Sequence, residues 1–170
     1  LIEQKRKEAV GDIFFSIKHV QNLKIEDDIL LIAGDSYIEN MDLKNFYDFY
    51  NKKKKTSIIY YEIKDRSEIQ NYGTIIVDEK TGKVEKFIEK PSEQMVEENK
   101  NLYPTAMIYF IPYEDSLKIT KFFKLEDNGV KNIFERLQHE MRIYATKMIG
   151  HRDDIGTLSE YIKIIKEKRK

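Results

Sequence analysis

The sequence predicts a layered α/β fold. Short apolar runs typical of strands recur along the chain, for example at 29–33 and 105–112, and segments with apolar residues at helical spacing lie between them. Strands that alternate with helices are typical of domains in which helices cover a sheet. A chain of 170 residues has the length of one ordinary domain, so we expect a single domain over 1–170.

The first half of the chain contains two predicted helices and two predicted strands. Apolar residues at helical spacing predict a helix over 13–21 with Asp12 as its N-cap. The continuous apolar run 29–33 predicts a strand that is buried on both faces. A helix capped by Asp42 and a strand within 56–63 follow.

The second half continues the same alternation. Gly82 lies in the turn of a predicted hairpin, where a positive φ is needed. The remaining elements are a hairpin over 72–91, a polar loop or irregular helix over 92–101, a strand over 105–112, a helix within 127–141, a strand over 142–149 and a final helix capped by Thr157 or Ser159.

Composition and charge exclude several classes of protein. The 30 basic and 30 acidic side chains cancel, so no overall field attracts nucleic acid or a membrane surface. No apolar run approaches the roughly 18 residues that span a bilayer, and the N-terminus does not resemble a signal peptide, so we expect a cytoplasmic protein. The absence of cysteine excludes disulfides, a thiolate nucleophile and a cysteine zinc site.

Three short stretches carry residues suited to phosphate chemistry. Gly34-Asp35 ends a predicted strand, Glu89-Lys90-Pro91 ends the hairpin, and Asp153 to Thr157 precede the last helix. Carboxylates at strand ends suit Mg²⁺, which takes one or two carboxylates together with phosphate oxygens and water. A neighbouring lysine supplies a compact positive charge for a phosphate. Together they indicate phosphoryl or nucleotidyl transfer.

The order of these stretches resembles the sugar-1-phosphate nucleotidyltransferase family, the pyrophosphorylases that make nucleotide-diphosphate sugars. The resemblance extends from Val10 to about Lys166. It is carried by Gly34-Asp35, Asp42-Leu43, Tyr72-Gly73-Thr74-Ile75-Ile76, Phe87 to Pro91, Ile108-Tyr109-Phe110-Ile111 and Asp154 to Thr157. It implies a Rossmann-like, GT-A-like nucleotide-diphospho-sugar transferase fold, with a mixed sheet flanked by helices.

The resemblance also implies roles for individual residues. Asp35 and Asp154 would hold Mg²⁺ against the nucleotide phosphates, and with Lys90 they form the expected catalytic set. Glu89 and Lys90 would bind the sugar hydroxyls and the sugar phosphate. Further substrate contacts are expected at Gly11, near the nucleobase, and at Gly34, Gly73, Thr105 and Ala106.

The implied reaction needs no protein nucleophile. An oxygen of a sugar 1-phosphate attacks the α-phosphate of a nucleoside triphosphate in line and releases pyrophosphate. The two small molecules are therefore the expected partners. Many such enzymes associate, which leaves a homo-oligomer open. The nucleotide stays open as well, with Gly11-Asp12 at the opening of the helix favouring the thymidylyl or glucose-type group.

The chain departs from the family pattern in three places. It lacks the glycine-rich Gly-x-Gly-x-Arg-Leu loop that cradles the triphosphate, so we expect a partial domain without its first strands, or a degenerate relative. Met107 stands where the family usually has glycine. Arg152 lies in the stretch before the second aspartate, where the family often has an aromatic residue.

Two alternative functions remain. A transferase-like domain without the triphosphate loop could bind nucleotide sugars as a regulatory module without turnover. A GT-A-type glycosyltransferase ranks last, because Gly34-Asp35-Ser36 does not supply the second aspartate of its usual Asp-x-Asp. A phosphatase of the Asp-x-Asp-x-Thr type fails at the same residues.

Overall fold

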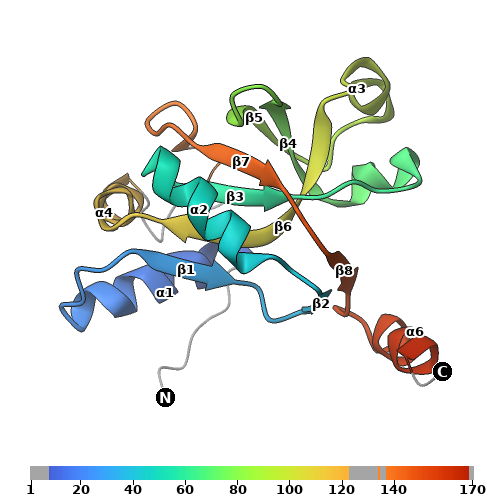
Figure 1. Ribbon diagram of the computed structural model, residues 1–170, viewed down its shortest axis with the longest axis horizontal. Coiled ribbons are helices and arrows are strands. Elements are labelled where there is room, and N and C mark those ends of the chain that lie inside the picture. The colour runs from blue at the N-terminus through green and yellow to red at the C-terminus, as the bar shows by residue number, and fades with distance from the viewer. Residues whose placement is uncertain (1–7, 123–133, 135–136, 169–170) are drawn as a thin grey trace.

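The computed structural model describes residues 8–122, 134 and 137–168. A mixed six-stranded sheet runs through these residues, and Figure 1 shows helices on both sides of it. Among the described strands, β3 and β7 run parallel and the other neighbouring pairs are antiparallel. The order across the sheet is β1 (Ile29–Ile32), β6 (Leu102–Ile111), β3 (Ser57–Tyr60), β7 (Tyr144–Lys147), β5 (Lys83–Glu89) and β4 (Gly73–Asp78). The predicted mixed α/β fold is confirmed.

Strand β6 organises the sheet because it pairs with three neighbours. Its C-terminal part lies between β1 and β3, and its N-terminal part pairs with β4. The register with β3 shifts between these parts, and Met107 has a positive φ of 55° there. The Ala33 N–H donates to the Met107 carbonyl over 3.1 Å, so the irregularity lies beside the end of β1.

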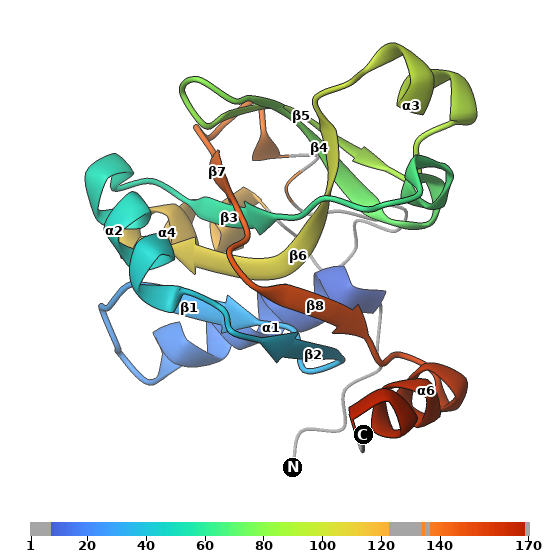
Figure 2. The ribbon, with the colours of Figure 1, turned by 45° about the vertical axis from the view of Figure 1, so that its right-hand side comes forward.

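Two hydrophobic clusters lie on opposite faces of the sheet. Neighbouring residues of β6 alternate between them, as side chains of a strand must. Helix α1 (Glu8–Asn22) covers one face with Ile13, Phe14 and Ile17, beside α4 (Tyr113–Phe122). Helix α2 (Leu43–Lys53) covers the other with Phe46, as Figure 2 shows. Beyond the sheet, η1 (Arg66–Asn71) contacts α3 (Glu93–Glu98).

A separate two-stranded ribbon extends from one end of the sheet. The chain turns at Gly34-Asp35 and forms β2 (Ser36–Glu39), which pairs antiparallel with β8 (His151–Asp154). Gly150, with a φ of 123°, allows the close approach of β8 to β2, because a Cβ there would lie 2.6 Å from the Glu39 carbonyl oxygen. Helix α6 (Leu158–Lys168) follows the ribbon (Figure 1).

Two predicted helix caps are confirmed. The Asp42 carboxylate accepts the Asn45 N–H over 2.8 Å at the start of α2. Thr157 starts α6 in a capping box, in which its Oγ1 accepts the Glu160 N–H and the Glu160 carboxylate accepts the Thr157 N–H. The cap predicted at Asp12 is wrong. Helix α1 begins at Glu8, because Glu8 and Ala9 are good helix formers and continue it upstream.

Strand β1 corrects a second prediction. The strand exists, but Leu30 and Ile32 are 40% and 45% exposed, so it is not buried on both faces. The reason is that one face of β1 is covered and the other is open: Ile29 and Leu31 pack against the cluster beneath α1, whereas Leu30 and Ile32 point to the opposite face. A continuous apolar run cannot reveal whether another element covers each face of the strand.

The sequence patterns missed several short elements. Strands β2 and β8, the 3₁₀ helix η1 and helix α4 were not predicted, and the polar segment after Pro91 forms α3, capped by Ser92. The helix expected within 127–141 lies largely outside the described residues, where Phe134 and Leu137 are helical and buried. None of the described helices is both long and apolar enough to cross a membrane.

The C-cap of α2 gives a test of backbone strain. Lys54 adopts a left-handed conformation with φ 47° and ψ 41°, which costs an L-residue about 1 kcal/mol and glycine almost nothing. Lys54→Gly and Lys54→Ala remove the same exposed side chain. We therefore expect Lys54→Gly to be more stable than Lys54→Ala by about 1 kcal/mol, or a Tm higher by about 2–4 °C in thermal unfolding. An equal or higher Tm for the alanine variant would contradict this reading.

Candidate functional site

The β2–β8 ribbon brings the backbones of the two predicted metal-binding residues, Asp35 and Asp154, close together. Ser36 lies opposite Asp154 in the register, and the Ile155 N–H donates to the Asp35 carbonyl over 3.0 Å. Asp35 is exposed, and the Asp154 side chain is 35% exposed. Both carboxylates therefore reach solvent at one end of the sheet.

Small residues leave space around these carboxylates. A Cβ added to Gly34 would meet no atom within 4 Å. The Gly156 N–H donates to Asp154 Oδ1 over 3.0 Å, and a Cβ on Gly156 would lie 3.2 Å from that oxygen. This contact orients the Asp154 carboxylate from one side.

A second group of predicted residues gathers at the hairpin. Gly73 lies opposite Glu89 in the register of β4 with β5. The Thr105 hydroxyl, which is buried, donates to the Gly73 carbonyl over 3.3 Å. Lys90 is exposed, has a positive φ of 50°, and donates its backbone N–H to the Tyr72 carbonyl. Four predicted substrate residues therefore lie together at the ends of β4 and β5.

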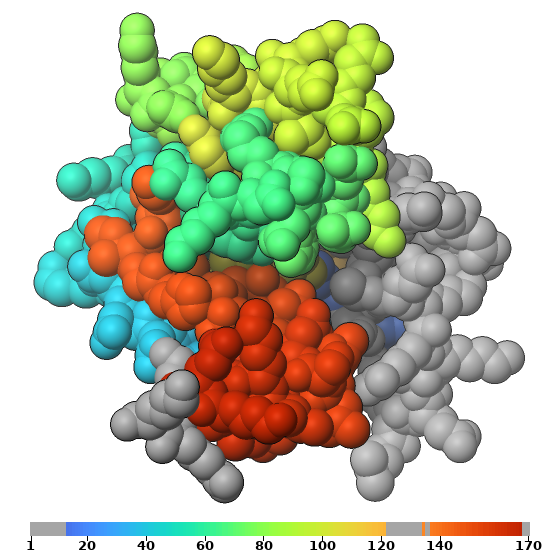
Figure 3. All heavy atoms as spheres, turned by 90° about the vertical axis from the view of Figure 1, so that its right-hand side faces the viewer, coloured from blue at the N-terminus to red at the C-terminus, as the bar shows by residue number. Residues whose placement is uncertain are grey.

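Tyr61 joins the two groups. Its hydroxyl accepts a hydrogen bond of 3.2 Å from Arg152 Nη1, and its ring meets Tyr72 edge-on, with 6.4 Å between the ring centroids. Its backbone N–H donates to the Pro104 carbonyl, next to Thr105. Figure 3 shows this end of the molecule, where the segment after β3 lies against β8 and α6.

Sequence reasoning did not select Tyr61 or Tyr72 as site residues, and it treated Arg152 only as a departure from the family. The adjacent tyrosines of Tyr60-Tyr61 belong to a strand-like run, which gives no sign that one of them turns toward a distant strand. Tyr72 precedes Gly73 in the predicted motif, and this position was the one sequence feature that indicated a place in the site.

The electrostatics of the two tyrosines follow from burial and from nearby charges. Burial raises the pKa of Tyr61 to about 12, although the neighbouring Arg152 guanidinium opposes this rise. Burial also raises the pKa of Tyr72, with smaller contributions from the carboxylates of Glu68 and Asp154. Both phenols are therefore neutral at physiological pH, and their O–H groups can donate a hydrogen bond to an acceptor.

Two predicted residues lie away from the exposed surface of the site. Ala106 is 1% exposed and packs with Phe46, so its side chain lies beneath the site. Gly11 lies inside α1, on the helix that covers one face of the sheet. Met107, where the family usually has glycine, adopts the left-handed conformation that favours glycine. Its thioether packs against the cluster beneath α1, and its sulfur accepts a hydrogen bond from the Tyr109 hydroxyl.

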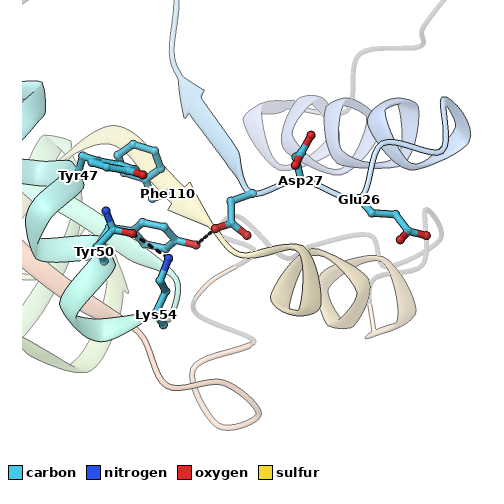
Figure 4. Close-up of a pocket in the computed structure, with 8 residues that line it drawn as sticks. Glu26, Asp27, Tyr47, Tyr50, Lys54 and Phe110 are labelled. Atoms are coloured by element: carbon cyan, nitrogen blue, oxygen red, sulfur yellow. Dashed lines mark hydrogen bonds between the residues drawn. The ribbon is translucent and has the colours of Figure 1, made fainter.

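A pocket elsewhere in the molecule contains none of these residues. It lies at the start of β1, whereas Gly34-Asp35 follow the end of that strand, and Figure 4 shows Tyr47, Tyr50 and Phe110 on one side of it. Tyr50 stacks on Phe110 and donates its hydroxyl to Asp28. The full lining is Glu26, Asp27, Asp28, Tyr47, Tyr50, Asn51, Lys54 and Phe110.

Comparison with known proteins identifies the family. The family model described as Nucleotidyl transferase matches residues 2–170, so the chain belongs to that family. The chain is 31% identical over 133 residues to a probable mannose-1-phosphate guanylyltransferase 3 of Arabidopsis thaliana. That alignment covers 77% of this chain and 37% of the relative.

Solved structures share the fold at low sequence identity. A UDP-glucose pyrophosphorylase complexed with UDP-glucose gives a TM-score of 0.74 at 20% identity, covering 99% of this chain and 65% of that chain. A putative glucose-1-phosphate thymidylyltransferase from Bacillus anthracis gives 0.71 at 16% identity, covering 98% and 63%. The chain therefore spans less than two thirds of the length of these proteins.

The raised pKa of Tyr61 predicts a loss of stability at high pH. An exposed tyrosine has a pKa of about 10. Because the folded pKa lies above this value, the contribution of Tyr61 to stability is complete below about pH 10 and is lost as the pH rises to about 12. In Tyr61→Phe, we expect the phenolate absorbance to show one fewer late-titrating group. We also expect the free energy of unfolding to fall less steeply over this range.

Tyr103→Phe is the matched control for this titration. Burial and a hydrogen bond to Glu79 raise the pKa of Tyr103 to about 12 as well, but the hydroxyl of Tyr103 donates to Glu79, whereas that of Tyr61 accepts from Arg152. Both variants should lose one late-titrating group. If Tyr61→Phe shows the same number of late-titrating groups as the wild type, Tyr61 ionises as an exposed tyrosine does and the assigned rise in its pKa is wrong.

Proposed function

We propose that the protein to which this chain belongs transfers a nucleotidyl group from a nucleoside triphosphate to a sugar 1-phosphate. A phosphate oxygen of the sugar 1-phosphate forms the new bond to the α-phosphorus, and the bond from that phosphorus to the pyrophosphate oxygen breaks. The observation that carries the proposal is the pairing of β2 with β8, which joins Asp35 and Asp154 at the end of the sheet.

The two carboxylates are a suitable donor set for Mg²⁺. Magnesium prefers hard oxygen ligands and is commonly held by one or two carboxylates, with the other positions filled by water and phosphate. Asp154 Oδ1 accepts the Gly156 N–H, and the carboxylate is partly exposed, so its second oxygen, Oδ2, can face a metal ion. When bound, the ion would neutralise negative charge on the reacting phosphates.

The hairpin residues suit the sugar phosphate. The exposed Lys90 supplies a compact positive charge for a phosphate, and Glu89 supplies acceptor oxygens for sugar hydroxyls. Gly73 lets a sugar ring approach the backbone between Glu89 and Thr105. In this assignment the residues of the chain bind and orient the substrates, and none acts as a nucleophile.

We further propose that residues 1–170 form part of one larger nucleotidyltransferase domain. The free edge of β1 supports this, because a further strand would pair with its backbone groups, and the exposed Leu30 and Ile32 leave an apolar face that another element would cover. The sequence argument for a thymidylyl or glucose-type enzyme is weakened, because Gly11-Asp12 do not open α1. The nucleotide and the sugar therefore need a substrate screen, in which mannose 1-phosphate and GTP belong because of the Arabidopsis relative.

A regulatory module that binds nucleotide sugars is the second candidate. The ribbon carboxylates and the hairpin residues would bind a nucleotide sugar without any need for turnover. Pyrophosphate release by the full-length protein separates the two. Turnover supports the enzyme, whereas binding of nucleotide sugars without turnover supports the module.

The metal assignment predicts the behaviour of three aspartate variants. Asp35→Asn and Asp154→Asn should each weaken Mg²⁺-dependent binding of a sugar 1-phosphate by at least about 10-fold, because each removes one charged ligand. In the full-length protein, Asp35→Asn should abolish Mg²⁺-dependent turnover while leaving the Tm unchanged. Isothermal titration calorimetry with and without Mg²⁺ measures the first effect, and pyrophosphate release measures the second.

Asp153→Asn is the matched control. Asp153 lies between Arg152 and Asp154 on β8, so its side chain points to the opposite face of the ribbon, where it contacts His151 Nε2 at 2.9 Å. This variant should bind Mg²⁺ and sugar 1-phosphate as the wild type does. If Asp35→Asn and Asp154→Asn behave like Asp153→Asn, the metal assignment fails.

A further inference from the structure

Arg152 is a charged side chain enclosed within the candidate site. Only 7% of its side chain is exposed, although it lies on a two-stranded ribbon at the end of the sheet. Its Nε–H donates to Ser36 Oγ over 2.9 Å, and its Nη1 donates to the Tyr61 hydroxyl over 3.2 Å. The guanidinium also lies over the Tyr61 ring, with 5.4 Å from Cζ to the centroid.

These contacts leave part of the charge of Arg152 uncompensated. Both hydrogen-bond acceptors are neutral hydroxyl groups. The guanidinium forms an ion pair with Asp154, but Asp154 Oδ2 lies 3.9 Å from Nη2, which is too far for a hydrogen bond. Within the described part of the chain, Nη2 donates no hydrogen bond. No side-chain nitrogen of the described residues is both fully buried and without a hydrogen-bond partner, so Nη2 is accessible to solvent and is free to meet an additional acceptor.

Phosphate is the acceptor that fits this arrangement. A guanidinium presents its N–H groups in a planar fork that matches two oxygens of a phosphate, and such bonds are among the strongest in proteins. An anion on Nη2 would also lie beside the Asp154 carboxylate, so it needs a cation on that carboxylate or a second positive charge. The proposed metal at Asp35 and Asp154 meets this need.

We propose that Arg152 is a substrate-binding residue that contacts the phosphate of the sugar 1-phosphate through Nη2. This inference rests on the proposed function and adds a residue to it. The family resemblance predicts an aromatic side chain in this stretch, which could stack on a ligand but would bring no charge. Arg152 therefore makes binding at this site depend more strongly on the phosphate, and on ionic strength, than an aromatic residue would.

A purely structural role is the competing explanation. Arg152 links β8 to Ser36 and to Tyr61, so its loss could loosen the ribbon and displace Asp154. The two roles differ in their effect on metal binding. Loosening the ribbon weakens Mg²⁺ binding. Removing a positive charge 3.9 Å from Asp154 leaves Mg²⁺ binding unchanged or strengthens it.

The experiment compares the full-length wild-type protein with its Arg152→Met and Arg152→Gln variants. Glutamine keeps a hydrogen-bond donor for Ser36 and Tyr61 but has no charge, so it preserves the test if the methionine variant does not fold. Isothermal titration calorimetry measures binding of α-D-glucose 1-phosphate and α-D-mannose 1-phosphate in the presence of Mg²⁺. Separate titrations measure binding of Mg²⁺ alone, and thermal unfolding confirms that each variant is folded.

Arg66→Met is the matched control. Arg66 is an arginine whose Nη2 donates to the backbone carbonyls of Val96 and Asn99, far along the chain from the ribbon. Its replacement removes a guanidinium with a structural role. Sugar 1-phosphate binding should not change in this variant.

We expect both Arg152 variants to bind sugar 1-phosphate about 10–100-fold more weakly than the wild type, which corresponds to the loss of a hydrogen bond to a charged group. Their affinity for Mg²⁺ alone should be equal to that of the wild type or higher. Unchanged sugar 1-phosphate binding in a folded Arg152 variant overturns the inference and leaves the proposed function intact. A joint loss of Mg²⁺ and sugar 1-phosphate binding also overturns it in favour of the structural role. If the full-length wild-type protein binds neither sugar phosphate, the proposed function fails and the inference fails with it.

Discussion

The pairing of β2 with β8 is the constraint on which the candidate site depends. Asp35 and Asp154 are far apart in the sequence, and the backbone hydrogen bonds of this short ribbon are what bring them together. A two-stranded ribbon has little stability by itself. Its inward-facing residues supply the rest: Ile38 packs against the cluster beneath α2, and Arg152 is held by Ser36 and Tyr61. The site is therefore only as rigid as these side-chain contacts.

The same contacts explain how one end of the sheet can carry two kinds of polar group. The carboxylates lie at the ribbon, and Glu89 and Lys90 lie at the hairpin. Tyr61 stands between them, with its hydroxyl toward Arg152 and its ring toward Tyr72. Burial keeps its phenol neutral, so the connection between the two groups carries no charge of its own.

Backbone strain occurs at two positions near this site, and also elsewhere in the described chain, for example at Lys54. Met107 and Lys90 both have positive φ values, a conformation that costs a residue with a side chain about 1–3 kcal/mol. Each is held by a backbone hydrogen bond, from Ala33 to the Met107 carbonyl and from Lys90 to the Tyr72 carbonyl. Such strain persists only where the surrounding structure fixes the backbone, and in proteins it gathers at sites where ligands bind. Its presence here agrees with the position of the predicted residues.

The sequence by itself determined the α/β class, the Asp42 and Thr157 caps, the hairpin turn at Gly82 and the family. These features depend on local patterns, which are visible along the chain. It also placed the predicted carboxylates at the ends of elements. It could not determine that β1 is an edge strand, because an apolar run is the same with or without a neighbour.

The tertiary structure alone decided which distant residues meet. Strands β2 and β8 have too few apolar residues to be recognised as strands, and they form because each satisfies the backbone hydrogen bonds of the other. Tyr61 belongs to a run that predicts only a strand, yet it leaves the sheet and accepts a hydrogen bond from Arg152. Pairing between segments far apart in the chain leaves no periodic signal in either segment, so the contacts of Tyr61 with Arg152 became visible only after the chain was folded.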